Sequence, residues 1–122
     1  MSATGIGVAD LERSATFYEN VLGMTRIRTI HLAYMDEIIM GFTDGPGAAV
    51  VLMHWTDGST RNYASNPVKL VFRTPDPHAV AERLVDNGGS MTFGPTSVPE
   101  FDGATIGLGT DPDGYVIELI GA

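Results

Sequence analysis

Short runs in which apolar and polar residues alternate are interrupted by two longer patterns with helical spacing. Thr4 to Val8 alternates in the way of a strand. Asp10 then offers an N-cap, apolar side chains recur at helical spacing over residues 11–22, and Gly23 supplies a stop. This stretch predicts a strand followed by a helix.

The same order returns in the second half of the chain. Val68 to Phe72 alternates, Asp76 and Pro77 open a second helical pattern, and this pattern ends at residues 87–89. The two capping aspartates lie 66 positions apart, and so do the predicted helix stops. We therefore expect a duplicated unit with no net insertion between the copies.

Three further strand-like runs follow each helix. In the first half they cover 24–30, 37–43 and 48–55, and in the second half 91–98, 104–109 and 115–120. Each half thus reads β-α-β-β-β. The predicted fold class is α+β, a single domain over 1–122 built from two tandem modules, about 1–58 and about 66–122, whose curved sheets enclose a small-molecule cleft.

The alternation also predicts which face of each strand meets a helix, because successive side chains point to opposite faces. The parity that we expect against the helices comprises Ile6, Val8, Val51, Met53, Trp55, Val68, Leu70, Phe72, Tyr115, Ile117 and Leu119. The parity left for the cleft comprises Gly5, Gly7, Val50, Leu52, His54, Lys69, Val71, Arg73, Val116, Glu118 and Ile120. The two glycines should leave open volume there.

Composition narrows the function classes. Seven Lys and Arg against fifteen Asp and Glu give 122 residues a formal net charge of −8, which would repel nucleic acid and anionic membranes. The chain has no cysteine, so disulfides, thiolate metal sites and cysteine nucleophiles are excluded. Mean hydropathy is +0.08, and the chain shows neither a bilayer-length apolar run nor a secretion signal. We expect a cytoplasmic protein.

Two motifs, residues 8–24 with the sequence VADLERSATFYENVLGM and residues 111–120 with DPDGYVIELI, resemble the vicinal oxygen chelate superfamily. This superfamily includes glyoxalase I, bleomycin-resistance proteins and extradiol dioxygenases. The resemblance implies paired β-α-β-β-β modules, commonly contributed by two subunits, and hence a homodimer. It also implies a divalent metal held at four equivalent strand positions.

Counted from the motifs, those metal positions fall on Ala3, Leu52, Lys69 and Glu118. Glyoxalase-I-like members carry His or Gln and Glu there, and only Glu118 retains such a ligand. Alanine and leucine offer no lone pair, and a protonated ammonium cannot coordinate a cation. The expectation is a protein without a metal or other cofactor.

Lys69 is the only lysine in the chain and shares its predicted face with Glu118, and the metal positions that the resemblance implies place the two side by side. In one interpretation Lys69 holds a substrate oxygen or enolate while Glu118 moves a proton. In the other, the two form a structural ion pair left by a decayed metal site. The sequence leaves both open.

Other polar residues are weaker candidates for the functional site. His54 is a second-rank catalytic candidate or a hydrogen-bonded strand residue, and Arg73 can receive a carboxylate or pair with an acid. The predicted ligand contacts are Arg73, Leu52, Gly5, Gly7, Val71 and Val50. Arg26 and Arg28 can attract an anion, and His31, Tyr34, Asp36 and Glu37 cluster in a turn without an assigned role.

Three functions remain. The first is a metal-independent enzyme that performs isomerisation, epimerisation, elimination or ring opening on a small, oxygenated, partly hydrophobic metabolite. The second is a binding protein that sequesters a drug or antibiotic in the apolar cleft. The third is a metal-dependent glyoxalase I-type lyase whose metal is held by His54 and Glu118.

Overall fold

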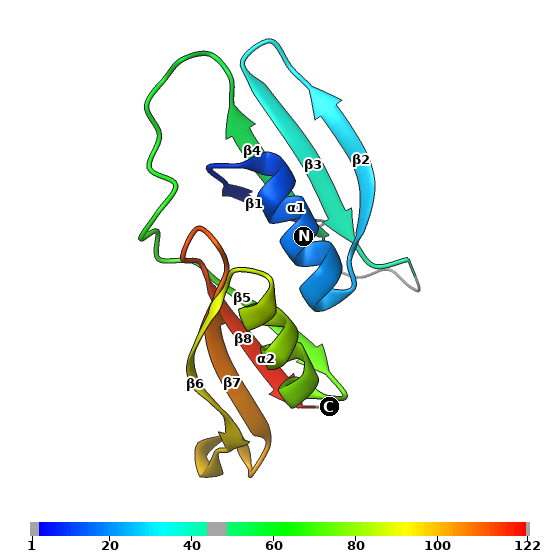
Figure 1. Ribbon diagram of the computed structural model, residues 1–122, viewed down its shortest axis with the longest axis vertical. Helices are drawn as coiled ribbons and strands as arrows, with labels where there is room; N and C mark the ends of the chain where they lie inside the picture. Colours follow the sequence, from blue (N-terminus) through cyan, green and yellow to red (C-terminus); the bar gives the residue numbers. More distant parts are fainter. Residues whose placement is uncertain (1–2, 44–48, 122) are drawn as a thin grey trace. The chain divides into compact units, whose positions relative to one another are not determined.

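The computed structural model describes residues 3–43 and 49–121, and the chain is α+β (Figure 1). It divides into unit 1, Met1–Tyr63, and unit 2, Ala64–Ala122. Each unit holds one four-stranded sheet with one α-helix packed across it. The predicted tandem β-α-β-β-β modules are confirmed.

Unit 1 runs β1 (Ala3–Gly7), α1 (Leu11–Leu22), β2 (Thr25–His31), β3 (Met35–Gly41) and β4 (Ala49–Trp55). Its strand order is β1-β4-β3-β2, with β1 parallel to β4 and the other pairs antiparallel. Ala48, the expected first residue of the last strand, lies outside the described residues.

Unit 2 repeats this plan with β5 (Lys69–Thr74), α2 (Pro77–Asp86), β6 (Ser90–Ser97), β7 (Thr105–Thr110) and β8 (Val116–Gly121). A short 3-10 helix, η1 (Pro99–Phe101), joins β6 to β7. The strand order is β5-β8-β7-β6, and β5 is parallel to β8.

The helix boundaries follow from the caps that the sequence offers. The Asp10 carboxylate accepts a hydrogen bond from the Arg13 backbone N–H, and Asp76 accepts one from Ala79 in the same way. Gly23 ends α1 in the left-handed region at φ 70°, where a side chain would be strained. These three predictions are confirmed.

Each core lies between a helix and one face of its sheet. In unit 2 Leu70, Ile117 and Leu119 are buried on the predicted face, and α2 packs across β6, β7 and β8. Burial of one such side chain is worth about 1.5–3 kcal/mol, so these faces dominate the stability of each unit.

The predicted orientation of β4 is wrong. Ile6 pairs with Leu52, so these two side chains share the α1 face, and both are at most 2% exposed. Val50 is buried on that same face, while Val51, Met53 and Trp55 are half-buried on the opposite one. Nearly every residue of β4 is apolar, so no alternation of polar and apolar residues indicates which face of the strand meets α1.

Among the helices of the described residues, none is long and apolar enough to cross a bilayer.

Candidate functional site

The sheet face of unit 2 that α2 does not cover carries the paired charges of Lys69 and Glu118. We call it the helix-free face of unit 2. The register aligns three rows across β6, β7, β8 and β5: Ser90–Thr110–Val116–Lys69, Phe93–Leu108–Glu118–Val71 and Thr96–Ile106–Ile120–Arg73. Lys69 and Arg73 therefore flank, on the edge strand, the row that contains Glu118.

Lys69 and Glu118 share one face, as the alternation predicted, and they meet, as the resemblance implied. The Lys69 Nζ donates a hydrogen bond to Glu118 Oε1 at 3.2 Å, and this contact is also an ion pair. The Glu118 side chain is only 9% exposed, whereas the Lys69 side chain is 53% exposed. An ammonium that reaches solvent thus holds a carboxylate that does not, which leaves the ammonium's other protons available to a ligand.

Apolar side chains surround this pair. Leu108 and Val71 lie on either side of Glu118 in its row, and Val71 is 50% exposed. Val116 and Phe93 on the same face are 36% and 45% exposed. A carboxylate set among exposed apolar groups suits an organic ligand with a hydrophobic body.

The corresponding face of unit 1 contains no such pair among its described residues. Val51 pairs with Gly5 just as Glu118 pairs with Val71, so Val51, not Leu52, corresponds structurally to Glu118. The expected cleft orientation of Leu52 and Val50 is wrong, because both side chains lie under α1 and not on the helix-free face. The offset of 66 thus applies to the first strands and helices but is 67 in the last strands.

Gly5 and Gly7 do not leave the open volume that we expected. A Cβ on Gly5 would lie 3.2 Å from the Met53 Sδ, and one on Gly7 would lie 3.2 Å from the Tyr63 ring and 3.5 Å from Trp55. These larger side chains already fill the space above the glycines. The glycines therefore serve close packing within unit 1.

His54 has the opposite parity from the one predicted. It pairs with Asp36, on the face of β4 that includes Leu52. Its Nδ1 lies 2.8 Å from the Val8 carbonyl oxygen, and because a carbonyl only accepts, Nδ1 carries the proton. The ring also stacks on Tyr63, with centroids 5.5 Å apart. His54 thus joins the end of β4 to the chain after β1.

The sequence did not predict a cluster in which Asp57, Ser59 and Arg61 gather beside Trp55. The Arg61 guanidinium lies 4.5 Å from the centre of the Trp55 ring, and its Nε donates to the Ser59 hydroxyl. Asp57 accepts hydrogen bonds from the Ser59 hydroxyl and backbone N–H, and these bonds lower the pKa of Asp57. The Asp-Gly-Ser sequence after the strand was the available signal, since it is typical of a turn.

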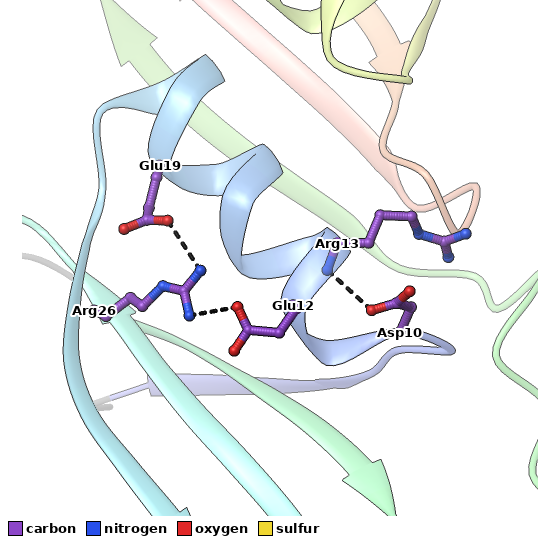
Figure 2. Close-up of polar contacts among 5 residues, drawn as sticks. All are labelled: Asp10, Glu12, Arg13, Glu19 and Arg26. Atoms are coloured by element: carbon purple, nitrogen blue, oxygen red, sulfur yellow. Dashed lines mark hydrogen bonds and ion pairs between the residues drawn. The ribbon is translucent and has the colours of Figure 1, made fainter.

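Arg26 is a structural residue of unit 1 (Figure 2). Its guanidinium pairs with Glu12 at 2.8 Å and with Glu19 at 3.2 Å, both on α1. Hydrogen bonds to Glu12 and then Glu19 raise the pKa of Arg26. The expectation that Arg26 attracts an anionic ligand is therefore wrong, because its charge is already matched.

Of the four turn residues His31, Tyr34, Asp36 and Glu37, the structure brings His31 and Asp36 into contact. His31 Nδ1 lies 2.9 Å from Asp36 Oδ1, and the His31 side chain is 75% exposed. Tyr34 is half exposed, and Glu37 lies opposite Met53 on the helix-free face of unit 1. This is the geometry of a solvated turn.

A shallow groove of about 490 Å³ lies between α2 and β6. Its lining residues are His78, Ala81, Glu82, Val85, Asp86, Met91 and Pro95. None of the predicted site residues borders it, so this hollow is separate from the Lys69–Glu118 pair.

The donor set does not fit the divalent metal that the fold implies. Ala3 has no donor, Lys69 is engaged with Glu118, and both Leu52 and its structural replacement Val51 are hydrocarbon. Within residues 3–43 and 49–121, no group of three His, Asp or Glu side chains is arranged to hold a metal ion. Glu118 alone is too few ligands for such a site.

Comparison with known proteins identifies the family of this chain. The family model of the Glyoxalase/Bleomycin resistance protein/Dioxygenase superfamily matches residues 1–119. A lactoylglutathione lyase of Salmonella typhimurium is 36% identical over 98% of this chain and 90% of its own length. One from Haemophilus influenzae is 31% identical over 96% and 88%.

Solved structures show the same fold. Glyoxalase I from Zea mays superposes with a TM-score of 0.84 at 26% identity, and the whole chain covers 44% of that enzyme. TnmS3, an antibiotic-binding protein from Streptomyces sp. CB03234, has a TM-score of 0.75 at 22% identity over 99% of this chain and 93% of its own. The match of the family model across nearly all residues, together with these relatives, shows that the chain belongs to the glyoxalase/bleomycin resistance protein/dioxygenase superfamily.

Proposed function

We propose that this protein is a glyoxalase-like enzyme that transfers a proton on a small, oxygenated, partly hydrophobic metabolite without a metal ion. The observation that carries the proposal is the 3.2 Å contact between Lys69 and the buried Glu118, with the exposed apolar Val71, Phe93 and Val116 around it. The relatives named lactoylglutathione lyase support a lyase or isomerase.

The chemistry follows from the two groups. The Glu118 carboxylate removes a proton from the carbon next to a substrate carbonyl, and the electron pair moves onto the carbonyl oxygen. The Lys69 ammonium donates a hydrogen bond to that oxygen and stabilises the enolate. Return of the proton to the other face of the same carbon gives epimerisation, and its return to the far carbon of a conjugated dienolate shifts the double bond, which is an isomerisation.

The test is hydrogen–deuterium exchange in D2O at the carbon next to the ketone of 5-oxo-5-phenylpentanoate and its amide, followed by NMR. Glu118→Gln should slow the exchange about a hundredfold or more, because the amide keeps the shape but cannot take the proton. Glu82→Gln, an exposed change on α2, is the matched control and should leave the rate unchanged. Full exchange in Glu118→Gln would remove this residue from the reaction.

Thermal unfolding of the same variants addresses a purely structural pair. Glu118→Gln should cost about 1 kcal/mol or less, since Lys69 reaches solvent, whereas Lys69→Met leaves a buried carboxylate unpaired and should cost about 2–3 kcal/mol. Lys69→Met with Glu118→Gln should recover most of that loss. A double variant that regains stability and also exchanges at the original rate would show that the pair is only structural.

The alternative is a protein that sequesters a hydrophobic drug or antibiotic, favoured by the exposed Val71, Phe93 and Val116 around the pair. Binding without any exchange in the wild-type protein would support it. A metal-dependent lyase would need donors other than those described above, and one tightly bound metal per chain in elemental analysis would support that case.

The proposal also includes a cytoplasmic homodimer that uses no cofactor and binds no nucleic acid. Each sheet is open and ends in two edge strands, which favours pairing with a second copy, and the charge of −8 disfavours polyanions. Light scattering should give twice the 13.0 kDa chain mass. A 13.0 kDa particle at micromolar concentration would contradict the dimer.

A further inference from the structure

Two arginines of the described residues, Arg28 and Arg73, have no side-chain partner, and Arg73 is the one that lies on the face of Glu118. Arg26 is held by two glutamates, Lys69 by Glu118, and Arg61 by the Trp55 ring. The exposed Arg73 makes no side-chain hydrogen bond or ion pair with any residue in 3–43 or 49–121. A guanidinium without an acid partner remains free to bind a carboxylate through two parallel hydrogen bonds.

The register places Arg73 next to the candidate catalytic pair. Lys69 and Arg73 have the same parity on β5, one on each side of the row in which Val71 pairs with Glu118. Their Cα atoms are roughly 13 Å apart, from about 3.3 Å per strand residue. Both long side chains can lean toward Glu118 from opposite sides, and Lys69 does so.

The local charge differs in sign from that of the whole chain. Lys69, Arg73 and Glu118 give the helix-free face of unit 2 a net charge of +1, while the chain carries −8. Because charges farther away than about 8 Å are screened at physiological salt, an anion on this face responds mainly to these three groups.

We propose that Arg73 anchors the carboxylate of an organic acid, and that the substrate is therefore an anion with an apolar body and a carbonyl several bonds from its carboxylate. This inference rests on the proposed function, in which Lys69 holds the carbonyl oxygen. The apolar body lies over Val71, and the carbon that loses its proton faces Glu118. Arg73 sets specificity and does not take part in the proton transfer.

Equilibrium binding tests the inference without turnover. The probes are 5-oxo-5-phenylpentanoate and its uncharged amide, titrated into labelled protein while backbone and methyl NMR shifts are followed. The acid should bind at least tenfold more tightly than the amide, with the largest shifts at Val71, Ile120 and Arg73. The preference should fall as salt rises.

Variants separate Arg73 from a general charge effect. Arg73→Gln should abolish the preference for the acid, Arg73→Lys should keep part of it, and Arg83→Gln on α2 should leave it unchanged. Glu118→Gln should strengthen binding of the acid several-fold, because it removes a like charge and frees Lys69. Equal affinities for acid and amide, a preference that survives Arg73→Gln, or no binding of either probe at millimolar concentration would overturn the inference.

The two proposals fail separately. Binding of the acid that depends on Arg73, with no exchange at the ketone, would leave this inference standing and refute the proton-transfer function. Exchange that is equally fast for acid and amide and is unaffected by Arg73→Gln would do the reverse.

Discussion

Unit 1 and unit 2 have the same strand order, yet equivalent positions on their helix-free faces carry different chemistry. Where unit 2 has Lys69 opposite Val116, unit 1 has Ala3 opposite Ala49. The other two equivalent pairs are Val71 with Glu118 against Gly5 with Val51, and Arg73 with Ile120 against Gly7 with Met53.

The two faces are also filled differently. In unit 1, Met53, Tyr63 and Trp55 occupy the space above the glycines, so the strands support packing. In unit 2, three charged side chains project from the same strand positions. A duplicated backbone thus holds a packed surface in one copy and a charged one in the other, and a few side chains make the difference.

The largest expected effect tests the correspondence between the two units. Leu52→Glu would bury a carboxylate under α1, where Leu52 is 0% exposed, and should cost more than about 4 kcal/mol of unfolding free energy. Val51→Glu on the helix-free face should cost about 1 kcal/mol. Denaturant unfolding of the two variants measures both. A tolerated Leu52→Glu with a disruptive Val51→Glu would reverse the assignment of faces.

A smaller effect concerns how each helix is attached to its sheet. In unit 1, Arg26 on β2 joins Glu12 and Glu19 of α1, as Figure 2 shows. Arg26→Gln should lower the free energy of unfolding by about 1 kcal/mol at low salt, since the pairs are partly exposed. The loss should shrink in 1 M salt because surface charges are then screened.

The matched control for Arg26 is Arg28→Gln on the same strand, which should change stability by less than about 0.5 kcal/mol. Equal losses in the two variants, or a loss that does not depend on salt, would show that Arg26 acts through packing of its hydrocarbon stem.

The smallest expected effect tests the packing of Arg61 on Trp55 in unit 1. Arg61→Gln removes the cation above Trp55 and should cost about 0.5–1 kcal/mol. Trp55 is the chain's only tryptophan, so its fluorescence should change in intensity and wavelength. Ser59→Ala, which removes the hydroxyl that holds Arg61 Nε, should produce a weaker change of the same sign. An unaltered spectrum in both variants would show that Arg61 does not cover the ring in solution.

Local signals made much of the architecture predictable. Asp10, Asp76 and Gly23 act on backbone groups a few residues away, so their capping roles can be predicted from the local sequence without knowing the fold. The face of Lys69 was also predictable, because charged residues alternate with apolar ones along β5, whereas its contact with Glu118 was implied by the resemblance.

The sequence by itself thus determined the order of the strands and helices, the duplication and the common face of Lys69 and Glu118. Only the tertiary structure decided that Leu52 faces α1, that Tyr63 covers Gly7 and that Arg61 covers Trp55. These outcomes depend on strand register and on contacts between side chains that no local pattern encodes. A strand apolar on both faces fits either orientation by composition, and its neighbours in the sheet select one.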